Sequence, residues 1–367
     1  MTLTQRINAF TQLGEFLSQF TRDAITQKEN IPHNDLFFDG MKHQIKLANE
    51  HNGWFTKDNI LFALESWSES LTKKNLVNWC SDYDDAFAKA DTQTSHSKKT
   101  VAVIMAGNIP LVGFHDFLSV LISGHRFVGK QSSNDKHLLP FIAKYLEYVD
   151  SNFKDLISFT EDKLPEHDAV IATGSDNTAR YFEYYFGKKP NIIRKNRNSI
   201  AVLTGNETPE ELVALGEDIF RYYGLGCRNV SKLLVPKDYN FDAFFNAMYH
   251  WKDIINIAKY ANNYDYNKAV YLMSLFDLLE NGFLMLKEDA SYGSPIATLF
   301  YERYETLEEV SKKLENDNDA IQCIVGSQSH LNHLDTTKNI IPLGQTQKPN
   351  LKDYADGIDI IAFLLMI

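Results

Sequence analysis

Basic residues are in short supply in this sequence. The chain of 367 residues has 37 Lys and Arg against 48 Asp and Glu, which gives a formal net charge of -11 at pH 7. Nucleic-acid-binding domains usually carry a basic face, so this charge argues against a nucleic-acid partner. A small basic pocket for a phosphorylated ligand is still compatible with an acidic chain.

Cysteines and long apolar runs are also scarce. The three cysteines, Cys80, Cys227 and Cys323, offer no disulfide framework, which favours a reducing compartment. No stretch approaches the ~20 apolar residues of a membrane span, and the amphipathic N-terminus lacks the apolar core of a signal peptide. The shorter apolar run IDIIAFLLMI at the C-terminus predicts a terminal strand or a docked tail. We therefore expect a cytoplasmic protein without a membrane span.

Several common chemical signatures are missing too. The sequence has no GxGxxG, no Walker A glycine-lysine pair, and no HExxH or other metal spacing among its 11 histidines. We therefore expect no metal site. What remains, 44% hydrophobic and 23% charged residues, is typical of a soluble globular protein. The length predicts one large domain or two ordinary ones.

The apolar pattern predicts the order of the elements in outline: helices first, then two α/β halves. Apolar residues at three- and four-residue steps predict helices over residues 1–90, and the polar run 89–99 predicts a connector. A βαβαβ pattern follows, the half-unit of a doubly wound parallel sheet whose strand ends bind ligands at one edge. Its strands are expected at 100–106, 125–130 and 167–175, with helices at 111–124 and 137–152.

The second half restarts this pattern. A strand is expected at 199–204, and Thr208, Pro209 and Glu211 predict a helix start that Gly224 and Gly226 bring to an end. An apolar strand, SKLLVP, follows, and PIATLFYERYETLEEV predicts a strand–turn–strand. The expected domains are 1–195 (helices plus a cofactor-binding α/β domain), 196–340 (a second α/β domain), and a tail, 341–367, for oligomerisation or return to the first domain.

Cys227 is the sharpest candidate for catalysis. It stands in GLGCRN, where glycines let the backbone approach a substrate and Arg228 could lower the pKa of the thiol. Such a turn can present both the sulfur and the Cys227 N–H to a carbonyl. The alternative interpretation is a small apolar residue at a helix end.

Three further candidates lie at predicted strand ends. Asn108, in AGNIP, can donate its amide to a developing oxyanion, or it can belong to a plain turn in which Pro110 starts a helix. Gly174 and Ser175, in ATGS, suit a pyrophosphate or ribose at a helix N-terminus. Lys130 ends the second strand, where a doubly wound sheet meets the adenosine ribose, although it can equally be a surface lysine.

Together these motifs resemble the aldehyde dehydrogenase superfamily in order and spacing, from Val101 to Val235. AGNIPLVGFHDFLSVLISGHRFVGK, ATGS and GLGCRNVSKLLV resemble its asparagine, glycine-serine and catalytic cysteine segments, and SYGSPIATLFYERYETLEEV resembles its phenylalanine-glycine-proline strand. The AGNIP loop, the GLGC turn and the tail PLGQTQKP…YADGID are similar to the LuxC-type long-chain acyl-CoA reductases, the fatty acid reductase subunits within that superfamily.

The resemblance implies an α/β, aldehyde dehydrogenase-like fold with two doubly wound parallel-sheet domains. It also implies that Cys227 attacks a long-chain acyl-CoA thioester, that Asn108 and the Cys227 N–H hold the oxyanion, and that a nicotinamide cofactor reduces the thioacyl-enzyme to an aldehyde. Lys130, Gly174 and Ser175 would contact this cofactor, and coenzyme A would be part of substrate and product. A homo-oligomer is implied as well, and an acyl-activating protein is a candidate partner.

The sequence departs from the family pattern at three positions. The general-base glutamate of hydrolytic members is replaced by Arg194, which suits an enzyme that passes its acyl group to hydride instead of water. The ribose-binding glutamate falls at Ala290, where Asp289 or another residue can substitute. Ser133 stands where NAD-preferring members have a glutamate, and serine does not repel a 2′-phosphate, so we expect NADPH, with NADH as the alternative.

Two rival functions stay open at this point. In one, the acyl group on Cys227 passes to a partner protein and reduction is secondary. In the other, the chain is a catalytically silent nucleotide-binding scaffold. Aldehyde formation without a second protein separates the first rival from the reductase.

Overall fold

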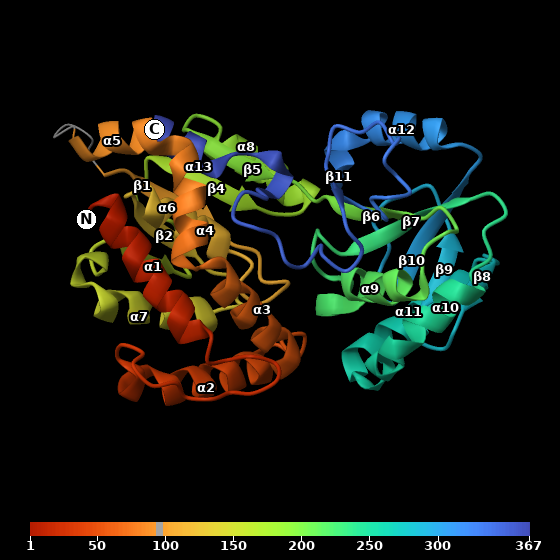
Figure 1. Ribbon diagram of the computed structural model, residues 1–367, viewed down its shortest axis with the longest axis horizontal. Helices are drawn as coiled ribbons and strands as arrows, with labels where there is room; N and C mark the ends of the chain where they lie inside the picture. The colour runs from red at the N-terminus through yellow and green to blue at the C-terminus, as the bar shows by residue number, and fades with distance from the viewer. Residues whose placement is uncertain (93–97) are drawn as a thin grey trace. The chain divides into compact units, whose positions relative to one another are not determined.

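The computed structural model describes residues 1–92 and 98–367. The chain divides into two compact units (Figure 1). Unit 1 comprises Met1–Lys195 and Asn350–Ile367, and unit 2 comprises Asn196–Pro349. The chain therefore passes from unit 1 into unit 2 and back again. Of the predicted connector 89–99, residues 93–97 lie outside the described part.

Unit 1 opens with the predicted helices. The first begins at Thr2, whose side chain accepts from the Gln5 N–H while the Gln5 side chain accepts from the Thr2 N–H, a capping box. Its apolar face is completely buried at Phe10, Leu13 and Phe16, which anchors it against the rest of unit 1. The confirmed helices are α1 (Leu3–Leu17), α2 (Asn34–His51), α3 (Lys57–Ser70), α4 (Lys73–Cys80) and α5 (Asp84–Thr92).

The sheet of unit 1 is parallel, with strand order β3-β2-β1-β4-β5. This order confirms the doubly wound half-unit, and its direction reverses between β1 and β4, where such sheets bind ligands. The helices α6 and α7 cover one face, and Phe182 and Phe186 of α8 pack on the other. The elements are β1 (Thr100–Ile104), α6 (Phe114–Ile122), β2 (Arg126–Lys130), α7 (Leu138–Val149), β3 (Ile157–Thr160), β4 (Ala169–Thr173), α8 (Asp176–Phe186) and β5 (Asn191–Arg194).

Two details of unit 1 differ from the sequence prediction. The strand expected third is β4, because the short edge strand β3 intervenes; its four residues are only partly buried or exposed, so they carry no apolar run. The C-terminal run is a helix, α13 (Ile360–Met366), and not a strand. It is nevertheless docked as expected: Ile360, Ile361 and Leu364 are buried, and it contacts α5 and α6.

Unit 2 contains a seven-stranded sheet in the order β12-β11-β6-β7-β10-β9-β8, parallel except for the β8–β9 pair. The capping box at Thr208 and Glu211 is confirmed, but two predicted boundaries are wrong. The helix ends at Phe220, before Gly224, and Thr306 caps a helix where a second strand was expected. The elements are β6 (Asn198–Val202), α9 (Pro209–Phe220), β7 (Val230–Pro236), α10 (Asp242–Met248), α11 (Ala258–Met273), β8 (Leu278–Glu280), β9 (Met285–Glu288), β10 (Thr298–Tyr304), α12 (Leu307–Asn316), β11 (Ile321–Val325) and β12 (Ile340–Ile341).

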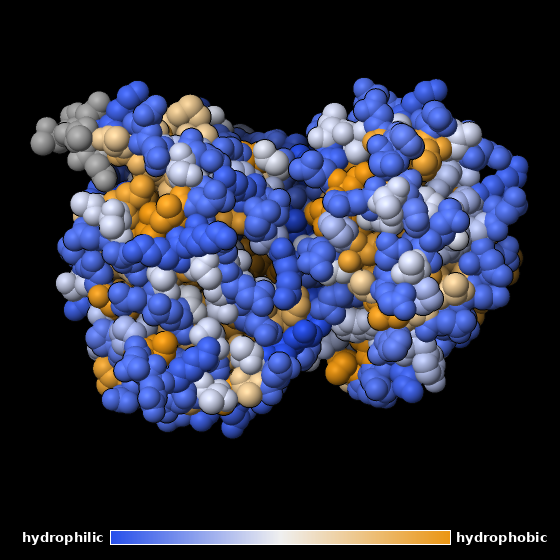
Figure 2. Space-filling model, viewed as in Figure 1, coloured by the Kyte–Doolittle hydropathy of each residue, from blue (hydrophilic) through white to orange (hydrophobic). Residues whose placement is uncertain are grey.

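The surface is predominantly polar on the face seen in Figure 2, with apolar residues in scattered patches. Across residues 1–92 and 98–367, no helix has the length and apolarity that crossing a membrane requires.

Candidate active site

Cys227 lies on an exposed turn of unit 2, whereas Cys80 and Cys323 are buried. The turn follows α9 and leads directly into β7. The Ser199 hydroxyl of β6 donates to the Cys227 carbonyl at 2.9 Å, which anchors the turn to the sheet. Cys227, the cysteine predicted to be catalytic, is therefore the only exposed one of the three.

The backbone that leads to Cys227 is strained. After α9, the 3-10 turn Arg221–Gly224 contains two tyrosines in the left-handed region, Tyr222 with φ 54° and Tyr223 with φ 60°. A non-glycine residue held there typically costs roughly 1–3 kcal/mol, and such residues concentrate at functional sites. Both tyrosines lie beyond the last residue of α9.

Arg228 has a partner of its own. Its guanidinium Nη1 donates to the Cys323 sulfur at 3.5 Å, so this cation contacts the thiol of β11. That Arg228 lowers the pKa of the Cys227 thiol stays a prediction.

Asn108 lies in unit 1, half-buried in the loop between β1 and α6. This loop runs close to the loop after β2: a Cβ on Gly107 would lie 2.4 Å from the Ser132 hydroxyl oxygen, so only glycine fits there. The helix begins at Phe114, not at Pro110, because Leu111 adopts a left-handed φ of 58°. The Leu111 N–H donates to Asp135 Oδ2 at 3.2 Å.

Asp135 is a feature of this site that the sequence analysis missed. Burial raises the pKa of its carboxyl to about 7, although the hydrogen bond from Leu111 opposes this shift. No described residue donates to its Oδ1. A lone acidic residue in QSSNDKH carries no sequence signal of its burial.

The predicted cofactor residues follow neighbouring strands of unit 1. Ile104 of β1 pairs with Lys130 of β2 and with Ala172 of β4, so the segments bearing Asn108, Lys130 and Gly174 leave the same edge of the sheet. Lys130 and Gly174 are half-buried, and Ser133 is exposed. Ser175 is the N-cap of α8, where its hydroxyl accepts from the Thr178 N–H at 3.3 Å.

Arg194, which the sequence resemblance aligned with the general base of hydrolytic members, is buried inside unit 1. Its two terminal nitrogens donate to the two carboxylate oxygens of Asp116, both at 2.8 Å. Arginine stays protonated, so this residue cannot accept a proton from water. The pair ties the end of β5 to α6.

Asp289, the expected substitute for the ribose-binding glutamate, is already engaged. Burial raises the pKa of Asp289, but hydrogen bonds from Lys287 and Ser291 outweigh it and lower the pKa to about 2. The neighbouring Ala290 carbonyl accepts from the completely buried ammonium of Lys232 at 2.7 Å, which also pairs with Glu302. Asp289 is therefore a fixed carboxylate.

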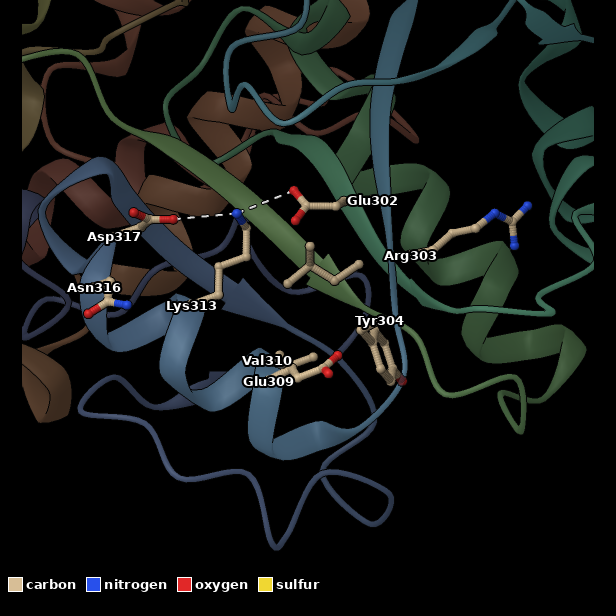
Figure 3. Close-up of a pocket in the computed structure, with 9 residues that line it drawn as sticks. Glu302, Arg303, Tyr304, Glu309, Val310, Lys313, Asn316 and Asp317 are labelled. Carbon is tan, nitrogen blue, oxygen red and sulfur yellow. Dashed lines mark ion pairs between the residues drawn. The ribbon is translucent and has the colours of Figure 1, made fainter.

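A cavity of about 370 Å³ in unit 2 lies beside α12 (Figure 3). Three of its charged side chains pair with one another: Lys313 lies 3.3 Å from Glu302 and 3.6 Å from Asp317. None of the residues predicted from the sequence to form the site lines this cavity. The lining residues are Leu234, Glu302, Arg303, Tyr304, Glu309, Val310, Lys313, Asn316 and Asp317.

A sequence model of the family described as acyl-CoA reductase (LuxC) matches residues 37–244, more than half of the chain. That range includes both Asn108 and Cys227. No curated protein matches the sequence significantly.

Solved structures with the same fold are aldehyde dehydrogenases and a related NADP-dependent enzyme, which confirms the predicted fold class. An acetylating aldehyde dehydrogenase from Geobacillus thermoglucosidasius has a TM-score of 0.60 at 13% identity, over 96% of this chain and 86% of that one. An NADP-dependent enzyme of E. coli has 0.62 at 13%, over 94% and 78%. A mutant indole-3-acetaldehyde dehydrogenase from P. syringae, bound to NAD+ and IAA, has 0.61 at 13%, over 92% and 75%.

Proposed function

The chain belongs to the acyl-CoA reductase (LuxC) family, and we propose from this premise that it reduces a long-chain acyl-CoA to the aldehyde through a thioacyl intermediate on Cys227. The family and the fold support redox chemistry on an acyl or aldehyde group. The observation that carries the finer proposal is the exposed position of Cys227 on a turn that runs into a buried strand.

The first half of the reaction is acyl transfer to the enzyme. The Cys227 thiolate attacks the thioester carbon, and the tetrahedral oxyanion accepts hydrogen bonds from the Asn108 amide and the Cys227 N–H. The carbon–sulfur bond to coenzyme A breaks, and its thiolate leaves with the bonding electrons and takes up a proton. Asn108 belongs to unit 1 and Cys227 to unit 2, so the two assignments are tested separately.

The second half is reduction of the acyl-enzyme. When bound in unit 1, a reduced nicotinamide would supply hydride for this reduction. Cleavage of the bond to Cys227 then releases the aldehyde and restores the thiolate. Arg194, locked to Asp116, activates no water, so hydrolysis does not compete at that position.

The residues of unit 1 fit a nicotinamide dinucleotide. The reversal of strand order between β1 and β4 is the usual place for such a ligand. The Ser175-capped start of α8 suits its pyrophosphate, and Lys130 suits its adenosine ribose or 2′-phosphate. Ser133 brings no negative charge to this edge, which favours NADPH over NADH.

The cofactor proposal has a direct test. We expect kcat/KM to be higher for NADPH than for NADH. A ratio of these constants well below one would refute the preference. Introducing the acidic residue, Ser133→Glu, should move the ratio toward NADH through charge repulsion.

The setting we propose is a reducing cytoplasm, in which the three cysteines stay in the thiol form. A homo-oligomer is the assembly that we propose from the family resemblance. An acyl-activating protein is a candidate partner that supplies the acyl group.

Intact mass spectrometry tests the proposed function. The protein is mixed with tetradecanoyl-CoA in the absence of nicotinamide, and we expect a single acyl adduct. Cys227→Ala should abolish the adduct, and Cys323→Ala, which removes a buried thiol, should retain it. Adding NADPH should discharge the adduct as aldehyde.

Other results favour the rival functions. An adduct that persists with NADPH but transfers to a second protein supports acyl transfer. The absence of any adduct over a range of chain lengths supports the silent scaffold.

A further inference from the structure

Asn229, the second residue after Cys227, is buried at the base of the nucleophile turn and is only 2% exposed. Its side-chain amide nitrogen donates to three carbonyls: Asp218 at 3.0 Å, Ile219 at 3.4 Å and Arg221 at 2.7 Å. These carbonyls belong to the last turn of α9 and to the residue that caps it. The side chain of Asn229 thus reaches back to the helix that comes before the nucleophile.

These hydrogen bonds explain why α9 ends where it does. The last carbonyls of a helix have no intrahelical donor and need a partner when they are buried. Asn229 supplies that partner to carbonyls on both sides of Phe220, the last residue of the helix. Beyond it the chain enters the left-handed conformation at Tyr222 and Tyr223. One side chain therefore stabilises the strained entry to the turn.

The other end of the same side chain fixes the residue before the nucleophile. Asn229 Oδ1 accepts from the Gly226 N–H at 2.8 Å, and the Asn229 N–H donates to the Gly226 carbonyl at 3.0 Å. That carbonyl is part of the peptide group that carries the Cys227 N–H. With the Ser199 hydroxyl on the Cys227 carbonyl, the backbone is held on both sides of the nucleophile.

We propose that Asn229 is a positioning residue: it orients the peptide between Gly226 and Cys227, so that the Cys227 N–H points at the substrate oxyanion. This inference rests on the proposed function for its catalytic consequence, but the orientation itself is a property of the turn. A group that only kept unit 2 folded would affect all reactions of Cys227 alike. A group that orients the N–H affects only those reactions that develop an oxyanion.

The experiment compares two reactions of the same thiol in Asn229→Asp. The variant keeps the size of the side chain but places a carboxylate oxygen against three carbonyls. We expect the repulsion to displace the side chain and, with it, the acceptor that holds the Gly226 N–H. The rate of acylation by tetradecanoyl-CoA, measured by intact mass spectrometry, should fall by about 10- to 100-fold, because this reaction needs the oriented N–H. Alkylation by iodoacetamide forms no oxyanion, so its rate should change by no more than about 3-fold. The two proteins are compared at equal thiolate fraction, which is determined from alkylation rates over a series of pH values.

Asn267→Asp is the matched control. Asn267 is a buried asparagine of unit 2 whose side-chain amide donates to the Ile296 carbonyl at 2.9 Å, and it belongs to α11. Its variant should leave the ratio of the two rates unchanged. If Asn229→Asp slows acylation and alkylation in parallel, or slows acylation no more than Asn267→Asp does, the positioning role is overturned.

Hydrogen exchange of the wild-type protein tests this inference independently of the proposed function. It uses no variant, so it does not depend on whether a variant folds. The Gly226 amide should exchange slowly although it lies in a turn, because Asn229 accepts from it. Exchange at the rate of an open turn would overturn the inference. A wild type that forms no acyl adduct yet protects Gly226 would instead refute the proposed function and leave the structural part of the inference supported.

Discussion

Asn108 is the residue of unit 1 that we propose as a hydrogen-bond donor to the oxyanion. Removing one preorganised donor to an oxyanion typically lowers kcat by about 100-fold or more. We expect Asn108→Ala to do so with acyl-CoA and NADPH, at little change in thermal unfolding. The exposed Asn134, in the loop after β2, offers the control variant Asn134→Ala. A loss of only a few-fold for Asn108→Ala would remove Asn108 from the mechanism.

Asp135 predicts a pH dependence of stability. Its pKa of about 7 in the folded state exceeds the value of 3.8 expected for a free side chain, so the folded protein binds this proton more tightly than the unfolded chain does. The stability it contributes is complete below about pH 4 and is lost as the pH rises through about 7. An asparagine imitates the protonated form at every pH.

Asp135→Asn should therefore flatten the stability profile. Relative to the variant, we expect the wild type to lose on the order of 2–3 kcal/mol between about pH 5 and about pH 8. Urea unfolding at the two pH values measures this difference. The exposed Asp162 provides a control, Asp162→Asn, that should follow the wild type. Parallel profiles for wild type and Asp135→Asn would contradict the assignment of this carboxyl.

At the scale of elements, the Asp116–Arg194 pair joins α6 to the end of β5 in the interior of unit 1. Breaking one side of a buried ion pair leaves a desolvated charge and typically costs about 3–5 kcal/mol, whereas an apolar replacement of both sides is often nearly neutral. We expect Arg194→Met to destabilise unit 1 by that amount. The double variant Asp116→Leu/Arg194→Met should recover most of it in urea unfolding. Additive losses would show that the two residues act independently.

The boundaries of α9 show what a sequence can and cannot predict. Its start depends on Pro209 at the first helical position and on Thr208 and Glu211, whose side chains accept from each other's backbone N–H groups. Such local interactions can be recognised in the sequence. Its end depends on Asn229, which lies beyond the turn and acts only once the chain has folded back. The glycines that were expected to end the helix lie further along.

The candidate site divides in the same way. Cys227 and Asn108 could be predicted as candidates because turns that contain glycine or proline after a helix or strand can be recognised from the sequence. Asp135 and Asn229 do not, since their importance comes from burial and from partners on other segments. The strand β3 was missed for a related reason: an edge strand without a buried apolar run has no periodic signal.

At the scale of the whole molecule, the chain leaves unit 1 at Lys195 and returns at Asn350. The returning segment is built into unit 1 by polar and apolar contacts. The Trp79 indole donates to the Tyr354 hydroxyl at 2.7 Å, and the Tyr83 hydroxyl donates to Asp359 at 2.6 Å. The His125 ring also hydrogen-bonds the Leu364 carbonyl at 2.8 Å. Unit 1 therefore depends on residues from both ends of the chain.

Deleting residues 358–367 should consequently destabilise unit 1 selectively. The deletion removes three side chains of α13, Ile360, Ile361 and Leu364, which are at most 1% exposed. Burying each of them contributes roughly 1.5–3 kcal/mol, so the total is a large part of the stability of a domain. Hydrogen exchange followed by mass spectrometry should show faster exchange over β1, β2 and α6. The strands β6, β7 and β10 belong to unit 2 and should keep their protection.

The helix itself provides the control for this deletion. Met366 lies in the last turn of α13 and is 79% exposed, so Met366→Ala should leave exchange unchanged. Uniformly faster exchange in both units after the deletion would mean that the two units unfold as one cooperative block, and unchanged exchange would mean that α13 adds nothing to unit 1. We expect protection to be lost selectively in unit 1, because residues of α1 and of α13 pack in the same hydrophobic core.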